Sequence, residues 1–103
     1  MNYEICVIGN EALLFPFLQF GFTTYAPATE AALREHLLEV IAEDYGIIYI
    51  EDSFCFSVRD IIDKYSTCLT PIFIPIGENE DGQSFAREMA VSLMERAIGQ
   101  NVI

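Results

Sequence analysis

The chain has 103 residues, which is enough for one hydrophobic core and too few for two ordinary domains, so we expect a single domain over residues 1–103. It carries 16 acidic and 5 basic side chains, for a formal net charge of -11. Proteins bind nucleic acids and anionic membrane surfaces largely through Lys and Arg, so this charge argues against both as partners and favours a basic protein surface.

No apolar run reaches the roughly 18 to 20 residues that cross a bilayer, and the N-terminus lacks the pattern of a signal peptide. We therefore expect a soluble, cytoplasmic protein without direct membrane insertion. The three cysteines form no Cys-x-x-Cys pair, which is typical of reduced thiols, and Cys6 lies in an apparent core strand. His36, the single histidine, has no Cys or His partner at zinc-ligand spacing, so we predict no metal site.

The first part of the chain predicts two strands around a short apolar segment. Residues 5–8 read as a first strand that ends at Gly9 and Asn10. Residues 12–19 follow as a short helix or turn that Pro16 interrupts. Residues 22–25 predict a second, more polar strand, and its shortness and alternation favour a position at the edge of a sheet.

The middle of the chain predicts a helix, a buried strand and a second helix. Apolar residues recur at helical spacing over residues 29–42, and the threonine at the start can cap that helix. Residues 46–50 form a continuous β-compatible run without alternation, as in a strand buried on both faces. Ser53 is the expected N-cap of a helix over residues 54–65, and ideal helical geometry places Phe56 on its exposed side.

The last part of the chain predicts a fourth strand and a long helix. Residues 71–76 form the strand, and its prolines favour an outer position that needs few N–H donors. Residues 77–83 form an acidic loop. We expect Ser84 to cap a helix over residues 84–98, which Gly99 ends near a C′ position.

Strands that alternate with helices through connections of crossover length predict an α/β fold with a parallel sheet. The expected architecture is a small flavodoxin-like, four-stranded sheet in the order 2-1-3-4, with helices on both faces and a C-terminal helix that a partner can bind. We find no repeat, linker or low-complexity segment that divides the chain.

Two carboxylates, Glu51 and Asp52, follow the third strand, and ligands of open α/β sheets bind at this end of the strands. A receiver-like phosphoacceptor signalling module is therefore the alternative function. Against it, no lysine follows the last strand, and only Asn10 and Glu11 stand where an acidic pair would hold Mg²⁺. Neither a dinucleotide fingerprint nor a P-loop occurs. We predict no catalytic residue and no cofactor, and we interpret both carboxylates as charges at a helix start.

Surplus apolar side chains are the stronger functional signal. The apolar arc of the last helix covers more of its circumference than packing on one side of a sheet requires, and four phenylalanines cluster within residues 15–22. The candidate partner-binding residues are Phe15, Phe17, Phe20, Phe56, Arg87, Val91, Met94 and Ile98.

Five short segments carry a family resemblance over nearly the whole chain. They are Val7-Ile8-Gly9, Phe20-Gly21-Phe22, Tyr45-Gly46-Ile47-Ile48-Tyr49-Ile50, Leu69-Thr70-Pro71-Ile72 and Ala97-Ile98-Gly99. In their order and spacing, the chain resembles the F subunit of the V-type and A-type rotary ATPases.

The resemblance implies a non-catalytic component of the central stalk, or rotor, which binds the coiled coil of the D subunit. Contacts with the catalytic A/B hexamer and with the adaptor of the membrane rotor would be indirect or transient. Such a component helps to couple ATP hydrolysis or synthesis to transport of hydrogen or other ions. It would lie in the cytoplasm, peripheral to the membrane as part of the ATPase complex.

Overall fold

Four parallel strands form one sheet in the order β2-β1-β3-β4, as predicted. The computed structural model describes residues 4–79 and 82–101. Its elements are β1 (Ile5–Ile8), α1 (Glu11–Gln19), β2 (Thr23–Tyr25), α2 (Glu30–Ala42), β3 (Ile47–Glu51), α3 (Asp52–Cys55), the 3-10 helix η1 (Phe56–Val58), α4 (Arg59–Lys64), β4 (Ile72–Ile76) and α5 (Phe85–Asn101). The α/β class, the strand order and the C-terminal helix are confirmed.

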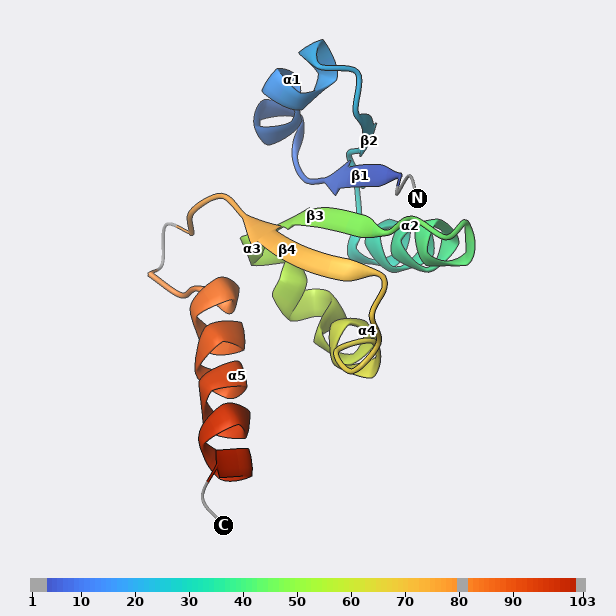
Figure 1. Ribbon diagram of the computed structural model, residues 1–103. Helices are drawn as coiled ribbons and strands as arrows, with labels where there is room; N and C mark the ends of the chain where they lie inside the picture. The colour runs from blue at the N-terminus through green and yellow to red at the C-terminus, as the bar shows by residue number, and fades with distance from the viewer. Residues whose placement is uncertain (1–3, 80–81, 102–103) are drawn as a thin grey trace.

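The hydrophobic core lies on one face of the sheet. Alternate residues of the strands, including Ile8, Ile48 and Phe73, are buried there against α2, α3 and α4. Leu37 of α2 is fully buried in the same cluster, and Thr29 caps this helix by accepting the N–H of residue 32 at 3.0 Å, as predicted. In Figure 1, α1 lies on the other side of the strands, and α5 points away from the sheet.

The segment after β3 is not the continuous helix predicted over residues 54–65. It consists of α3, one 3-10 turn and α4. Because a 3-10 turn has about 3.0 residues per turn, it changes the rotational phase of the side chains that follow. Val58 is fully buried, and Phe56, the first residue of the turn, is half-buried against the core beside Phe85 instead of facing solvent. The prediction that Phe56 is exposed was therefore wrong.

Two predicted helix ends also need correction. Ser53 is not an N-cap, because α3 begins at Asp52, two residues earlier than predicted, and Glu51 occupies the cap position without a side-chain cap. Gly99 does not end the last helix, since α5 continues to Asn101. A glycine inside a helix costs only about 1 kcal/mol relative to alanine, so the other residues of a long helix can offset it.

Within residues 4–79 and 82–101, no helix is both long enough and apolar enough to cross a membrane.

Two of the three thiols are enclosed by the fold. Cys6 and Cys55 are fully buried, whereas Cys68 is exposed. The pKa of the Cys6 thiol and that of the Cys55 thiol are both raised to about 12, mainly by burial. Since the thiolate is the reactive form, both thiols are inert in the folded chain.

We predict that one thiol per chain, that of Cys68, reacts rapidly with Ellman's reagent at pH 8 under native conditions. All three should react at once in denaturant, because unfolding exposes Cys6 and Cys55 to water. The measurement is the stoichiometry of thiolate release over time. Rapid reaction of two or more thiols in the folded protein would contradict the enclosed positions of Cys6 and Cys55.

Candidate functional site: the outer face of α5

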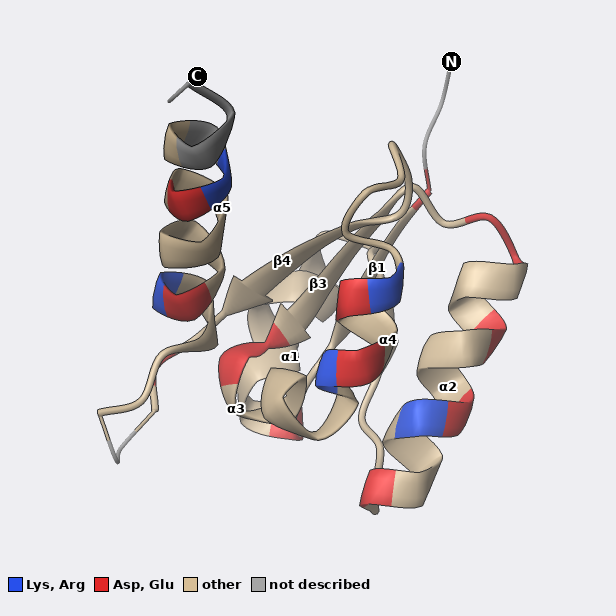
Figure 2. Ribbon diagram, turned by 90° about the horizontal axis from the view of Figure 1, so that it is seen from below, with Lys and Arg blue, Asp and Glu red and all other residues tan. Residues whose placement is uncertain are grey.

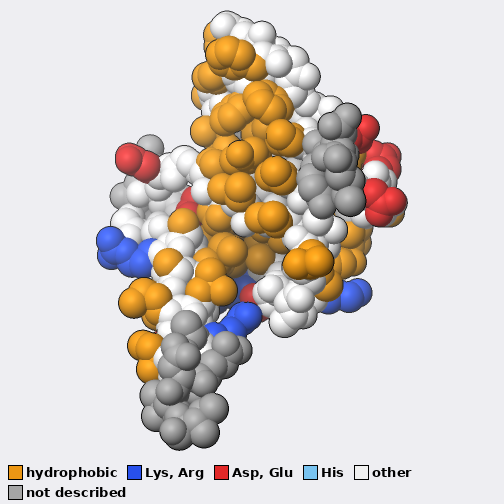
Figure 3. Space-filling model, in the orientation of Figure 1, with side chains coloured by type: hydrophobic (Ala, Val, Ile, Leu, Met, Phe, Trp, Pro, Cys, Tyr) orange, Lys and Arg blue, Asp and Glu red, His pale blue; other side chains and the backbone are white. Residues whose placement is uncertain are grey.

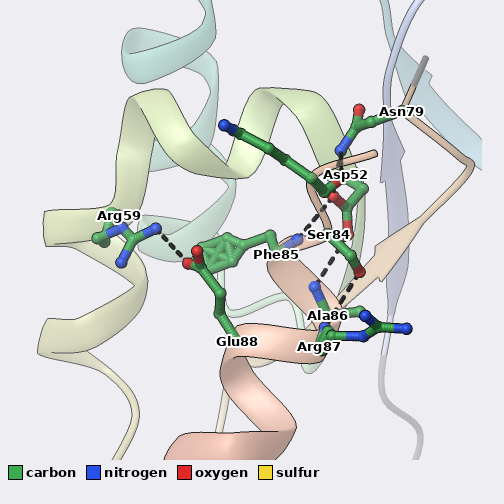
Figure 4. Close-up of polar contacts among 9 residues, drawn as sticks. Asp52, Arg59, Asn79, Ser84, Phe85, Ala86, Arg87 and Glu88 are labelled. Atoms are coloured by element: carbon green, nitrogen blue, oxygen red, sulfur yellow. Dashed lines mark hydrogen bonds and ion pairs between the residues drawn. The ribbon is translucent and has the colours of Figure 1, made fainter. Parts of the chain in front are cut away.

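A buried carboxylate holds the start of α5. Asp52 has a relative exposure of only 4%, and its Oδ1 accepts the backbone N–H of Phe85 at 2.8 Å. Its Oδ2 accepts the N–H of Ala86 at 3.0 Å (Figure 4). Ser84 supplies the predicted cap, because its Oγ accepts the N–H of Arg87 at 3.1 Å. The sequence predicted that Asp52 stabilises the start of the helix that follows β3, whereas its hydrogen bonds stabilise the N-terminus of α5.

The loop before α5 is tied to the same carboxylate. Asn79 donates from Nδ2 to Asp52 Oδ1 and to the backbone carbonyl of Gln83, at 2.6 Å in each case. These bonds hold the residues around the acidic loop close to the end of β3, where α5 must begin.

An aromatic and ionic contact holds the first turn of α5 against η1 and α4. Phe85 is 3% exposed, and its ring centroid lies 5.3 Å from that of Phe56. The Arg59 guanidinium lies over both rings, at 5.6 Å from Phe56 and 5.1 Å from Phe85, and it forms an ion pair with Glu88 (Figure 4). Cation–π contacts of this kind add to the burial of the phenylalanine rings.

Beyond its first turn, α5 exposes an apolar stripe. Arg87, Val91, Met94 and Ile98 recur at alternating intervals of four and three residues, so they share one side of the helix. Val91, Met94 and Ile98 are 46%, 63% and 59% exposed, and Arg87 is exposed as well. Phe85 and Met89 lie on the other side of α5 and pack on the core. We call Arg87, Val91, Met94 and Ile98 the outer stripe of α5, and their role as partner contacts stays a prediction.

A groove of about 300 Å³ separates the inner side of α5 from α4 and the edge of β4. Leu93 of α5 and Ile62 of α4 line it, together with Tyr65 and Ile72. Although Leu93 faces the domain, it remains 58% exposed, because α5 does not close onto the sheet. Thus α5 has exposed apolar residues on both sides.

The phenylalanine cluster of the sequence divides into two parts. Phe15 and Phe20 are 62% and 81% exposed on and after α1. Phe17 is half-buried, with its ring 5.9 Å from that of Phe22 and 6.5 Å from that of Tyr49. Phe15 and Phe20 are thus free to contact a partner, whereas Phe17 partly completes the packing of α1 on the sheet.

Hydrogen bonds within the chain occupy the other strand-end carboxylate. Glu51 Oε1 accepts from the backbone N–H and the Nδ2 of Asn10, at 3.0 and 2.6 Å, and its Oε2 accepts from Ser53 Oγ at 2.8 Å. Asn10 Oδ1 in turn caps α1 by accepting the N–H of Leu13 at 2.9 Å. A phosphoacceptor role for Asp52 would require release of the α5 cap. The arrangement therefore gives no support to a receiver-like site.

Metal-ligating side chains do not gather in the part of the chain that the structure describes: no group of three or more His, Cys, Asp or Glu could hold a metal ion there. The His36 ring instead packs on Tyr25, with centroids 5.0 Å apart, as expected for a histidine beside the apolar stripe of α2.

Comparison with known proteins identifies the family. The family model described as "ATP synthase (F/14-kDa) subunit" matches residues 5–94. The chain belongs to this family. A similar curated protein is the F subunit of the V-type ATP synthase of Fusobacterium nucleatum subsp. nucleatum, with 23% identity over 103 residues, which cover 100% of this chain and 98% of the relative. The predicted resemblance is confirmed, and family membership makes the chain one component of an ATP synthase with partner subunits.

We predict that Asp52→Ala lowers the free energy of unfolding by about 1 to 3 kcal/mol, because two N–H groups of the first turn of α5 lose their acceptor. The amide hydrogens of Phe85 and Ala86 should also exchange faster with solvent. Urea denaturation and hydrogen exchange measure these effects.

Ser53→Ala is the matched control, because Ser53 is exposed and its hydroxyl donates to Glu51 and not to α5. Its effect should stay within about 0.5 kcal/mol. Equal stability and equal exchange rates for Asp52→Ala and Ser53→Ala would show that Asp52 does not hold α5.

Proposed function

We propose that this chain is a non-catalytic component of the central stalk of a V-type or A-type rotary ATPase. In this role it binds the coiled-coil D subunit through the outer stripe of α5. Turning with that coiled coil, it helps to couple ATP hydrolysis or synthesis to ion transport. Its place is the cytoplasmic side of the membrane, within the peripheral part of the complex, and contacts with the A/B hexamer and the membrane-rotor adaptor are indirect or transient.

The observation that carries the proposal is the outer stripe itself. Val91, Met94 and Ile98 repeat at the interval that a helix uses to pack along another helix in a coiled coil. Each is about half exposed or more, although α5 is firmly held at its first turn. A helix that is fixed at one end and apolar on its solvent side is suited to pack against a partner helix.

Family membership and charge support the same partner. The chain matches the ATP synthase (F/14-kDa) subunit family, and its relative of similar length is named as the F subunit of a V-type ATP synthase. A net charge of -11 favours encounter with a basic protein. Arg87 adds a long side chain that can both cover apolar surface and pair with a carboxylate of the partner.

We predict that Met94→Glu weakens binding to the purified coiled-coil partner by at least about tenfold, because a charge would be buried in an apolar helix interface. The matched control is Leu38→Glu, since Leu38 is also an exposed apolar residue, 51% against 63%, but lies on α2. Isothermal titration calorimetry gives both dissociation constants, and circular dichroism establishes that each variant is folded.

Binding by Leu38→Glu should stay within about twofold of the unmodified chain. If the unmodified chain forms no complex with the coiled-coil partner, the proposed function is wrong. If Met94→Glu binds as well as Leu38→Glu, the outer stripe of α5 is not the interface.

A further inference from the structure

One face of the sheet is apolar but only partly covered. The register aligns Ile5 with Ile47 and Ile72, and it aligns Tyr49 with Ile74, so these five side chains project from the same face. We call them the open sheet face. Ile72 is 50% exposed, and the other four are half-buried. On the opposite face, Cys6, Ile8, Ile48, Ile50 and Phe73 are buried in the core, and Pro75 is half-buried.

The α1 helix covers only part of this face: Val7, which pairs with Tyr49, is fully buried, whereas the five residues of the open sheet face stay partly or half exposed. The Leu13 side chain of α1 reaches Gly9 and Gly77, at the ends of the strands, and the Phe17 ring packs beside that of Tyr49. The first turn of α5 packs with the core of the opposite face through Phe85. Figure 3 shows the result as a continuous band of apolar side chains over α1 and the strands.

The chemistry of the face indicates what can bind there. β3 is hydrogen-bonded to β1 on one side and to β4 on the other, so its face offers side chains and no free strand edge. A partner that covers the face itself must therefore pack side chains against it, although β4, as an edge strand of the described sheet, keeps one unpaired edge. The faces of parallel sheets are normally covered by helices, which makes a helix the fitting occupant.

The distribution of charged residues around the open sheet face indicates which kind of helix fits it. All five Lys and Arg residues of the chain lie in α2, α4 and α5, and Figure 2 shows the strands free of them. Glu4, Glu43 and Asp44 are exposed at the end where the central strands begin, and Glu11 and Glu78 are exposed near the other end. This charge distribution complements a helix whose apolar stripe is flanked by Lys or Arg.

We propose that the open sheet face is a second docking surface, which receives a basic amphipathic helix of the same coiled-coil partner that the outer stripe of α5 contacts. This inference rests on the proposed function. Two separate contacts would fix the orientation of the domain on the rotor, because Asp52 and Phe85 hold α5 to the same domain that carries the open sheet face. A second copy of this chain is a poor occupant, because it would bring another charge of -11 to an acidic surface.

The test compares Ile72→Glu with Leu38→Glu in binding to the purified coiled-coil partner. The two residues match in size and in exposure, 50% and 51%, but only Ile72 lies on the open sheet face. We expect Ile72→Glu to raise the dissociation constant by about tenfold or more and Leu38→Glu to change it by less than about twofold. Melting temperatures of the two variants should be similar, since both changes are at half-exposed positions.

A photo-crosslinking amino acid at Ile74 provides a measurement that does not depend on a loss of binding. It should crosslink to a Lys- or Arg-flanked helix of the coiled-coil partner, whereas the same group at Leu38 should not. Crosslinking to a second copy of this chain, or none at Ile74 within a complex that forms, would overturn the inference.

The outcomes separate the inference from the proposed function. If Met94→Glu weakens the complex while Ile72→Glu binds like Leu38→Glu, the proposed function stands and the second docking surface is refuted. If the unmodified chain does not bind the coiled-coil partner, both are refuted.

Discussion

The carboxylate of Asp52 joins the end of β3 to the start of α5, and the position of the outer stripe of α5 follows from it. It is buried, so its charge requires the N–H groups of Phe85 and Ala86 and the amide of Asn79 as partners. Those N–H groups in turn have no partners within the helix and need an acceptor. The buried carboxylate and the N–H groups of the first turn satisfy each other, and their hydrogen bonds fix the start of α5 beside the end of β3.

From that point, α5 leaves much of the apolar surface of the chain without cover. Its first turn is secured by Phe85 and by the ion pair of Arg59 with Glu88, while the apolar residues of the outer stripe extend into solvent. A hydrophobic content of 52% is high for a chain of 103 residues, and a charge of -11 opposes self-association of the exposed part. Apolar surfaces combined with strong charge are typical of a protein that is completed by a partner.

Local rules predicted much of the fold. The apolar runs located all four strands to within one residue at either end, and the caps Thr29 and Ser84 were found because a capping side chain bonds to residues two or three positions away. The crossover connections predicted a parallel sheet, and the flavodoxin-like order expected for it is the order observed. The parts that could not be predicted depend on distant contacts or small changes in geometry. Asp52 caps a helix that begins 33 residues later, and no local pattern connects the two. Phe56 packs inward because Phe85, 29 residues later in the chain, lies against its ring. The outer stripe of α5 was visible in the sequence as spacing, whereas the exposure of Leu93 on the inner side depends on α5 standing away from the sheet, which no local pattern shows.

An electron cryomicroscopy map of the assembled ATPase would show whether the chain acts through surfaces that pack on a rotor. We predict that the chain lies beside the coiled coil of the central stalk, with Val91, Met94 and Ile98 buried against a helix of that coiled coil and the Asp52 cap intact. A map that places the chain outside the central stalk, or that shows the outer stripe of α5 exposed to solvent in the complex, would contradict this prediction.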